Sequence, residues 1–112
     1  MAEEFFDRLP EEVRCAVRSA LHAARQLPGA EKVVVFGSYA KGTQGPDSDL
    51  DVAVFFGEDD HTPFLFRHRA LTRLCVNPEI DIQIQAFSSA ELDAPCGIVE
   101  EIVKYGIELP GA

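Results

Sequence analysis

The sequence contains the run Val33-Val34-Val35-Phe36-Gly37-Ser38 and, ten residues later, the run Asp49-Leu50-Asp51-Val52. The first run begins with β-branched residues and stops at a glycine, which predicts a buried strand over residues 31–37. The second run continues into Val52-Ala53-Val54-Phe55-Phe56, which predicts another buried strand over residues 50–56. We therefore expect two strands joined by a loop rich in glycine and polar residues.

Two aspartates, Asp49 and Asp51, stand at the start of the second expected strand. Residues two apart in a strand point to the same face, so the two carboxylates are expected side by side while Leu50 points into a core. Neighbouring carboxylates repel each other and are costly to desolvate, and a divalent cation relieves both costs. Mg²⁺ prefers one or two carboxylates together with substrate phosphates, and Mn²⁺ accepts the same oxygen ligands.

A short segment beginning at Gly37 and Ser38 supplies a second element of the expected site. Glycine allows a tight turn and a close approach of backbone to ligand. We expect Ser38 to cap a helical turn over residues 39–41, which would leave backbone N–H groups facing outward, as in many phosphate sites. Lys41 lies within this turn and would add positive charge.

The pattern of Gly37-Ser38, ten residues and then Asp49-x-Asp51 resembles the signature of the DNA polymerase β-like nucleotidyltransferase superfamily. Over residues 20–109 the chain resembles the minimal nucleotidyltransferase (MNT) proteins, many of which are antitoxins beside HEPN-domain toxins. The resemblance implies an α/β (α+β) fold with a polymerase β-like palm core, in which helices pack mainly on one face of a small mixed sheet. It also implies a third carboxylate on a later strand, and Asp81 in the alternating segment 79–85 matches it.

The activity that the resemblance implies is Mg²⁺-dependent transfer of a nucleoside monophosphate, AMP from ATP, to a hydroxyl group. Gly37 and Ser38 would hold the phosphates, and Asp49, Asp51 and Asp81 would hold two Mg²⁺ ions. The acceptor would be a tyrosine of a partner HEPN toxin in a hetero-oligomer, so that the protein acts as an antitoxin. The alternative is a binding module that neutralises its partner by occlusion, and the sequence leaves the base preference open.

Composition limits the remaining possibilities. The chain has 112 residues, a net charge of −9 and an apolar fraction of 46%, which are typical of one globular domain. Nucleic-acid polymerases and RNA-binding proteins usually present a basic face, so direct contact with nucleic acid is disfavoured. No apolar run is long enough to span a membrane. The three cysteines form no metal pattern, which favours reduced thiols in the cytoplasm.

A single domain over residues 1–112 is expected to contain three parts. An N-terminal helix covers residues 10–27, the catalytic core covers residues 31–87, and a helical segment covers residues 88–109. Within the core, Thr62-Pro63 predicts the start of another helix. In the last part, Ser88-Ser89-Ala90-Glu91 has the form of a capping box. Residues 105–109 resemble the ending of MNT proteins, which implies a brief last strand.

Overall fold

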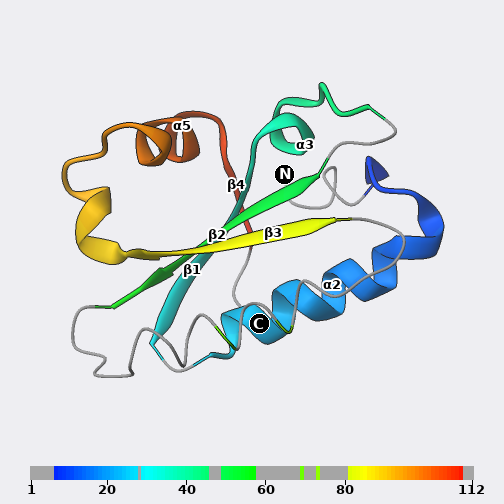
Figure 1. Cartoon of the computed structure of the whole chain (residues 1–112), viewed down its shortest axis with the longest axis horizontal. Helices are drawn as coiled ribbons and strands as arrows, with labels where there is room; N and C mark the ends of the chain where they lie inside the picture. Colours follow the sequence, from blue (N-terminus) through cyan, green and yellow to red (C-terminus); the bar gives the residue numbers. More distant parts are fainter. Residues whose placement is uncertain are drawn as a thin grey trace.

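A four-stranded mixed sheet forms the centre of the protein (Figure 1). The computed structural model describes residues 7–27, 29–45, 49–57, 69, 73 and 81–109. The strands follow the spatial order β3-β2-β1-β4. Their bounds are Ala30–Phe36 for β1, Leu50–Phe56 for β2, Ile82–Ser88 for β3 and Ile107–Glu108 for β4. The expected α+β fold with a small mixed sheet is therefore confirmed.

The strand pairing determines which residues meet at each end of the sheet. β1 runs antiparallel to both β2 and β4, with Phe36 opposite Asp51. β2 and β3 are parallel, with Leu50 opposite Ile82 and Asp51 opposite Gln83. The end of β1, the start of β2 and the start of β3 consequently lie at the same end of the sheet.

Helix α2, Glu11–Arg25, covers one face of the sheet (Figure 1). Its apolar residues recur at helical spacing, so that Val13, Val17, Leu21 and Ala24 share one side and are buried. They pack in one cluster with alternate residues of the strands, among them Val33, Val35, Leu50, Val52 and Val54. The sequence pattern thus predicted the helix and its buried side.

The opposite face of the sheet is covered by α5, Ile98–Tyr105, and by the short 3₁₀-helix η1, Ser89–Leu92. Val99 and Ile102 of α5 pack in a second cluster with Val34, Ala53 and Phe55. Helices therefore lie on both faces, which differs from the expectation that they pack mainly on one. The reason is that β2 is apolar on both sides of the strand, so both of its faces require cover.

Most of the expected element boundaries agree with the structure. The strand expected over 79–85 lies further along the chain, since β3 covers Ile82–Ser88. The expected capping box is present at Ser88. The helix expected from Thr62 lies outside the described residues, except that Arg69 and Arg73 are helical. In the described part of the chain, every helix is too short or too polar to cross a bilayer.

Candidate active site

Gly37 joins β1 to the one-turn helix α3, Ser38–Lys41, and directly contacts the carboxylate of Asp51. Its backbone has φ 75° and ψ −152°, a combination that only glycine adopts readily. A Cβ atom at this position would lie 2.5 Å from Asp51 Oδ2, so the Asp51 carboxylate would have to move to make room for a side chain. Glycine therefore suits both the turn and the space that the carboxylate occupies.

The turn α3 begins one residue earlier than expected. Its N-cap is Gly37, and no side-chain hydrogen bond caps it, so the prediction that Ser38 acts as the cap was wrong. The physical reason is that the glycine itself makes the sharp turn, and the Lys41 N–H donates to the Gly37 carbonyl at 3.1 Å. Backbone N–H groups at the start of a helical turn have no partner within the turn, so they are available to a ligand, as in phosphate-binding sites.

Arg8 holds the other end of α3. Its guanidinium donates to the carbonyl oxygens of Tyr39 at 2.7 Å and Ala40 at 3.0 Å. The Tyr39 side chain is buried in the core beneath α2, and burial raises the pKa of its phenol. The turn that follows Gly37 is thus fixed from two sides.

Asp49 and Asp51 lie at the start of β2, as expected, on the strand face that α5 covers. Leu50 between them is fully buried in the opposite core, whereas Asp49 is exposed and Asp51 is half-buried. Partial burial raises the pKa of Asp51 above its ordinary value, and the negative charges of Asp49 and Glu101 raise it further. Asp49 and Glu101 therefore both lie close enough to Asp51 to disfavour its ionisation.

Asp81 immediately precedes β3, next to the aspartate pair. Its carbonyl accepts a hydrogen bond from the Leu50 N–H at 2.8 Å, and extending the register places it opposite Asp49. The backbone of Asp81 therefore lies beside that of Asp49 at this end of the sheet, and the Asp81 side chain is exposed. Within the ranges that the structure describes, however, no three His, Cys, Asp or Glu side chains are gathered closely enough to hold a metal ion by themselves.

Lys41 extends from α3 towards α5 and pairs with Glu101. Its Nζ lies 2.6 Å from Glu101 Oε1, and it also lies 4.9 Å from the centre of the Tyr105 ring. The hydrogen bond to Glu101 raises the pKa of the Lys41 ammonium. Sequence reasoning missed Glu101, because two acidic residues in the first turn of a helix are ordinary partners of the helix dipole.

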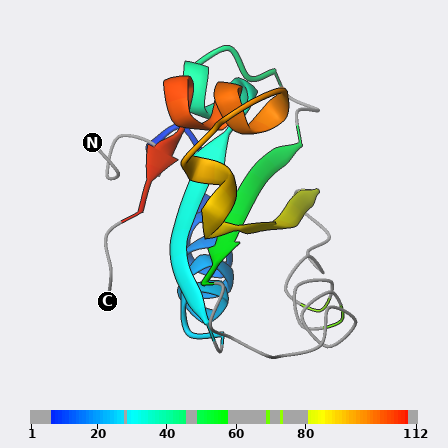
Figure 2. The same cartoon turned by 90° about the vertical axis from the view of Figure 1, so that its left-hand side faces the viewer.

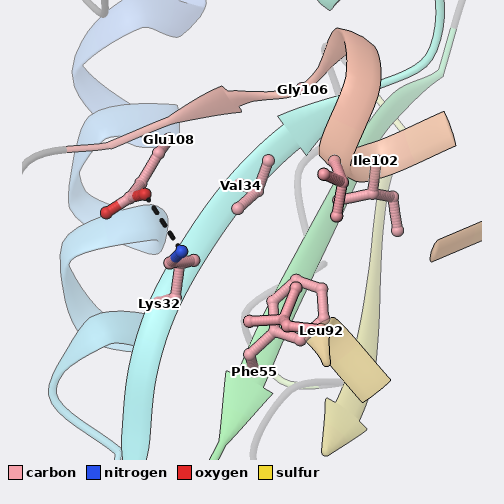
Figure 3. A pocket seen from close by; sticks show the side chains of 8 residues that line it. Lys32, Val34, Phe55, Leu92, Ile102, Gly106 and Glu108 are labelled. Atoms are coloured by element: carbon pink, nitrogen blue, oxygen red, sulfur yellow. Dashed lines mark ion pairs between the residues drawn. The ribbon is translucent and has the colours of Figure 1, made fainter. Parts of the chain in front are cut away.

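A small cavity lies on the α5 side of the sheet, away from these residues (Figure 3). The Lys32–Glu108 ion pair, 3.3 Å long, closes one side of it. Its volume is about 160 Å³, whereas ligand pockets usually occupy about 300–1,000 Å³. It is lined by Lys32, Val34, Phe55, Leu92, Ile102, Val103, Gly106 and Glu108. We interpret it as a packing gap, because it is too small for a nucleotide and contains none of the expected site residues.

The aspartate pair fits a magnesium ion. Two neighbouring carboxylates, one of them partly desolvated and raised in pKa, provide hard oxygen ligands that ionise more readily beside a cation. Only two such ligands are needed, since Mg²⁺ commonly completes its coordination with water and with substrate phosphates. The contact between Gly37 and Asp51 places the pair against the turn that is suited to phosphate.

Comparison with known protein families gives one match that covers most of the chain. A family model described as a nucleotidyltransferase domain matches residues 17–109. A search of curated proteins found no significant match. The family match includes every residue of the expected site.

Solved structures share the fold at low sequence identity. A candidate nucleotidyltransferase from Sulfolobus solfataricus superposes with a TM-score of 0.59 at 20% identity, covering 96% of this chain and 84% of that one. A chain of a toxin–antitoxin complex solved with AMP-PNP gives 0.59 at 23% identity, covering 88% and 73%. A chain of an MntA–HepT toxin–antitoxin complex gives 0.55 at 18% identity, with the same coverage of 88% and 73%.

Proposed function

Because this chain belongs to the nucleotidyltransferase domain family, we propose that it transfers a nucleoside monophosphate, AMP from ATP, to a hydroxyl group. One observation carries the proposal: the Asp51 carboxylate fills the space that a side chain at Gly37 would need. This contact joins an acidic pair to a turn suited to phosphate. An arrangement of this kind suits phosphoryl transfer, in which catalysis depends mainly on positioning and on charge neutralisation.

The expected residues have complementary roles. Gly37 and Ser38 bind the β- and γ-phosphates through backbone N–H groups, and Lys41 belongs to the same turn. Asp49 and Asp51 hold Mg²⁺, with Asp81 contributing to a second ion. When bound, Mg²⁺ neutralises the triphosphate and makes the acceptor hydroxyl more acidic.

The transfer exchanges one bond to phosphorus for another. The acceptor oxygen forms a bond to the α-phosphorus, while the bond from that phosphorus to the bridging oxygen breaks and pyrophosphate leaves. Asp81 takes the proton of the acceptor hydroxyl as the general base. Its exposed position at the start of β3 is compatible with an acceptor that arrives from solvent.

We propose that the acceptor is a tyrosine of a partner HEPN toxin, and that the transfer makes this protein an antitoxin. The support is that chains with this fold occur in toxin–antitoxin complexes, one of which was solved with AMP-PNP. The free thiols of Cys15 and Cys96 suit a reducing compartment such as the cytoplasm. A hetero-oligomer with the toxin is the expected assembly.

Occlusion of the toxin without chemistry is the second candidate. Ile98, Val103 and Tyr105 of α5 are between 43% and 55% exposed, which is unusual for large apolar side chains on one short helix. Such a surface suits contact with a protein partner. The two functions are compatible, because a bound partner would also present its hydroxyl.

The test is to co-express the chain with the HEPN protein of its genomic neighbourhood and to measure the intact mass of that partner. Wild type is compared with Asp49→Asn/Asp51→Asn, which removes two carboxylates at nearly constant shape. The matched control is Asp93→Asn/Glu100→Gln, which removes the same charge at two exposed positions.

We expect a partner heavier by one or more nucleotide units with wild type and with the control, and an unmodified partner with the double aspartate variant. Modification that survives in the aspartate variant would contradict the assignment of the site. An unmodified partner that co-purifies with all three forms would favour occlusion.

A further inference from the structure

Helix α5 contributes a carboxylate to the edge of the proposed nucleotide site. Glu101 accepts a hydrogen bond from the Lys41 ammonium at 2.6 Å, so that α5 is tied to the turn that begins at Gly37. Both views of the molecule place α3 and α5 near each other at the same end of the sheet (Figures 1 and 2). The ion pair therefore lies beside the residues proposed to bind phosphate.

The Lys41 ammonium is held by more than one group. Glu101 provides the short ion pair. The ring of Tyr105, which is on the same helix as Glu101, lies 4.9 Å from the ammonium. Lys104 lies over the same ring at 5.3 Å, so α5 brings a second cation nearby. Lys41 is nonetheless the cation that belongs to the phosphate-binding turn itself.

Glu101 also acts on the acidic side of the site. Its helix covers the strand face from which Asp51 projects, so the carboxylates of Glu101 and Asp51 lie on the same side of the sheet. Thus Glu101 offsets the charge of Lys41 and adds to the negative charge of Asp49 and Asp51. The site, taken with its surroundings, is negatively charged until a metal ion binds.

We propose that Glu101 is a positioning residue that holds Lys41 and offsets its charge, so that a metal-free nucleoside triphosphate binds more weakly than it would beside an unpaired lysine. The inference rests on the proposed function, because it assumes that the triphosphate binds beside Gly37. A metal-free triphosphate meets two or more carboxylates and a lysine that is already paired. The metal-bound triphosphate carries its own neutralising charge and does not need Lys41 to be free.

The test measures ATP binding by titration calorimetry at one ionic strength, once with excess EDTA and once with Mg²⁺. The variants are Glu101→Gln, the control Glu100→Gln and the double variant Lys41→Gln/Glu101→Gln. Glu100 is the exposed neighbour of Glu101, so the control makes the same change in net charge. The Lys41–Glu101 pair is partly exposed, at 36% and 40%, so its loss is expected to leave the fold intact, which thermal melting of each variant checks.

We expect Glu101→Gln to bind ATP in EDTA on the order of tenfold more tightly than wild type, because a charged hydrogen bond becomes available to the phosphates. The control is expected to match wild type, and the double variant to lose the gain. If wild type binds ATP with Mg²⁺ but Glu101→Gln equals the control in EDTA, the inference is overturned and the proposed function stands. If wild type fails to bind ATP even with Mg²⁺, the proposed function is overturned, and the inference with it.

Discussion

Replacing Gly37 by alanine tests the contact on which the proposed site depends. The chain offers a control at Gly97, which has a similar backbone, with φ 59° and ψ −129°. A Cβ atom at Gly97 would meet nothing within 4 Å, whereas one at Gly37 would lie 2.5 Å from Asp51 Oδ2. The two substitutions thus share the backbone cost and differ in whether a carboxylate must move.

The backbone cost at either glycine is about 1–3 kcal/mol, because non-glycine residues rarely adopt this conformation. At Gly37 we expect a further loss of about 1 kcal/mol, since Asp51 must leave its preferred rotamer to make room. The ligand effect is the more decisive measurement. At an ATP–Mg²⁺ concentration about 100 times Kd, binding stabilises a protein by about 2.7 kcal/mol. Gly97→Ala should keep that gain, and Gly37→Ala should lose it.

Urea unfolding of both variants, with and without ATP and Mg²⁺, measures both the loss of stability and the stabilisation by the ligand. A double-mutant cycle with Asp51→Ala isolates the steric part, because removal of the carboxylate should lower the cost of Gly37→Ala to that of Gly97→Ala. The reasoning fails if Gly37→Ala is no less stable than Gly97→Ala and is still stabilised by the nucleotide.

Two further substitutions, one in the site and one beside it, can be tested by urea unfolding. Because the pKa of Asp51 is raised in the folded state, ionisation of its carboxyl group opposes folding. The protonated carboxyl group contributes its full stability below the ordinary pKa of 3.8, and this contribution is lost as the pH rises through the folded-state pKa. In EDTA, Asp51→Asn should therefore be more stable than wild type near neutral pH, with the difference shrinking towards pH 3.8 in urea titrations; a less stable variant at neutral pH would contradict the shift. Arg8→Ala removes charged hydrogen bonds to the carbonyls of Tyr39 and Ala40 and should cost about 1.5–3 kcal/mol in the same assay, and an unchanged urea midpoint would show that α3 does not depend on it.

Local patterns predicted most of the fold. The helical spacing of Val13, Val17 and Leu21 gave α2 and its buried side, and the apolar run 50–56 matched β2 at both ends. The arrangement of the helices about the sheet was harder to predict, because an apolar run does not show which helix will cover each of its faces. Only the three-dimensional packing showed that α5 covers the side opposite α2.

The candidate site was predictable where its residues are close in sequence. The spacing of Asp49 and Asp51 in a strand, and the break at Gly37, were sufficient to locate the acidic pair and the turn. Glu101 was not predictable, because its partner Lys41 is 60 positions away and nothing local distinguishes it from Glu100. The cap was misassigned because serine is a common N-cap, whereas here the glycine conformation sets the start of α3.

The position of β2 explains why the Gly37 turn and the destabilised Asp51 lie together. This strand is buried along its whole length after Asp51, so its first polar side chains can emerge only at the end of the sheet where β1 turns away. There the Asp51 carboxylate occupies the position that a side chain at Gly37 would need. A site built in this way costs stability while it is empty, because the Asp51 carboxylate is partly buried and lies near other negative charges. A bound cation offsets this cost, so metal binding should stabilise wild type by more than it stabilises Asp51→Asn.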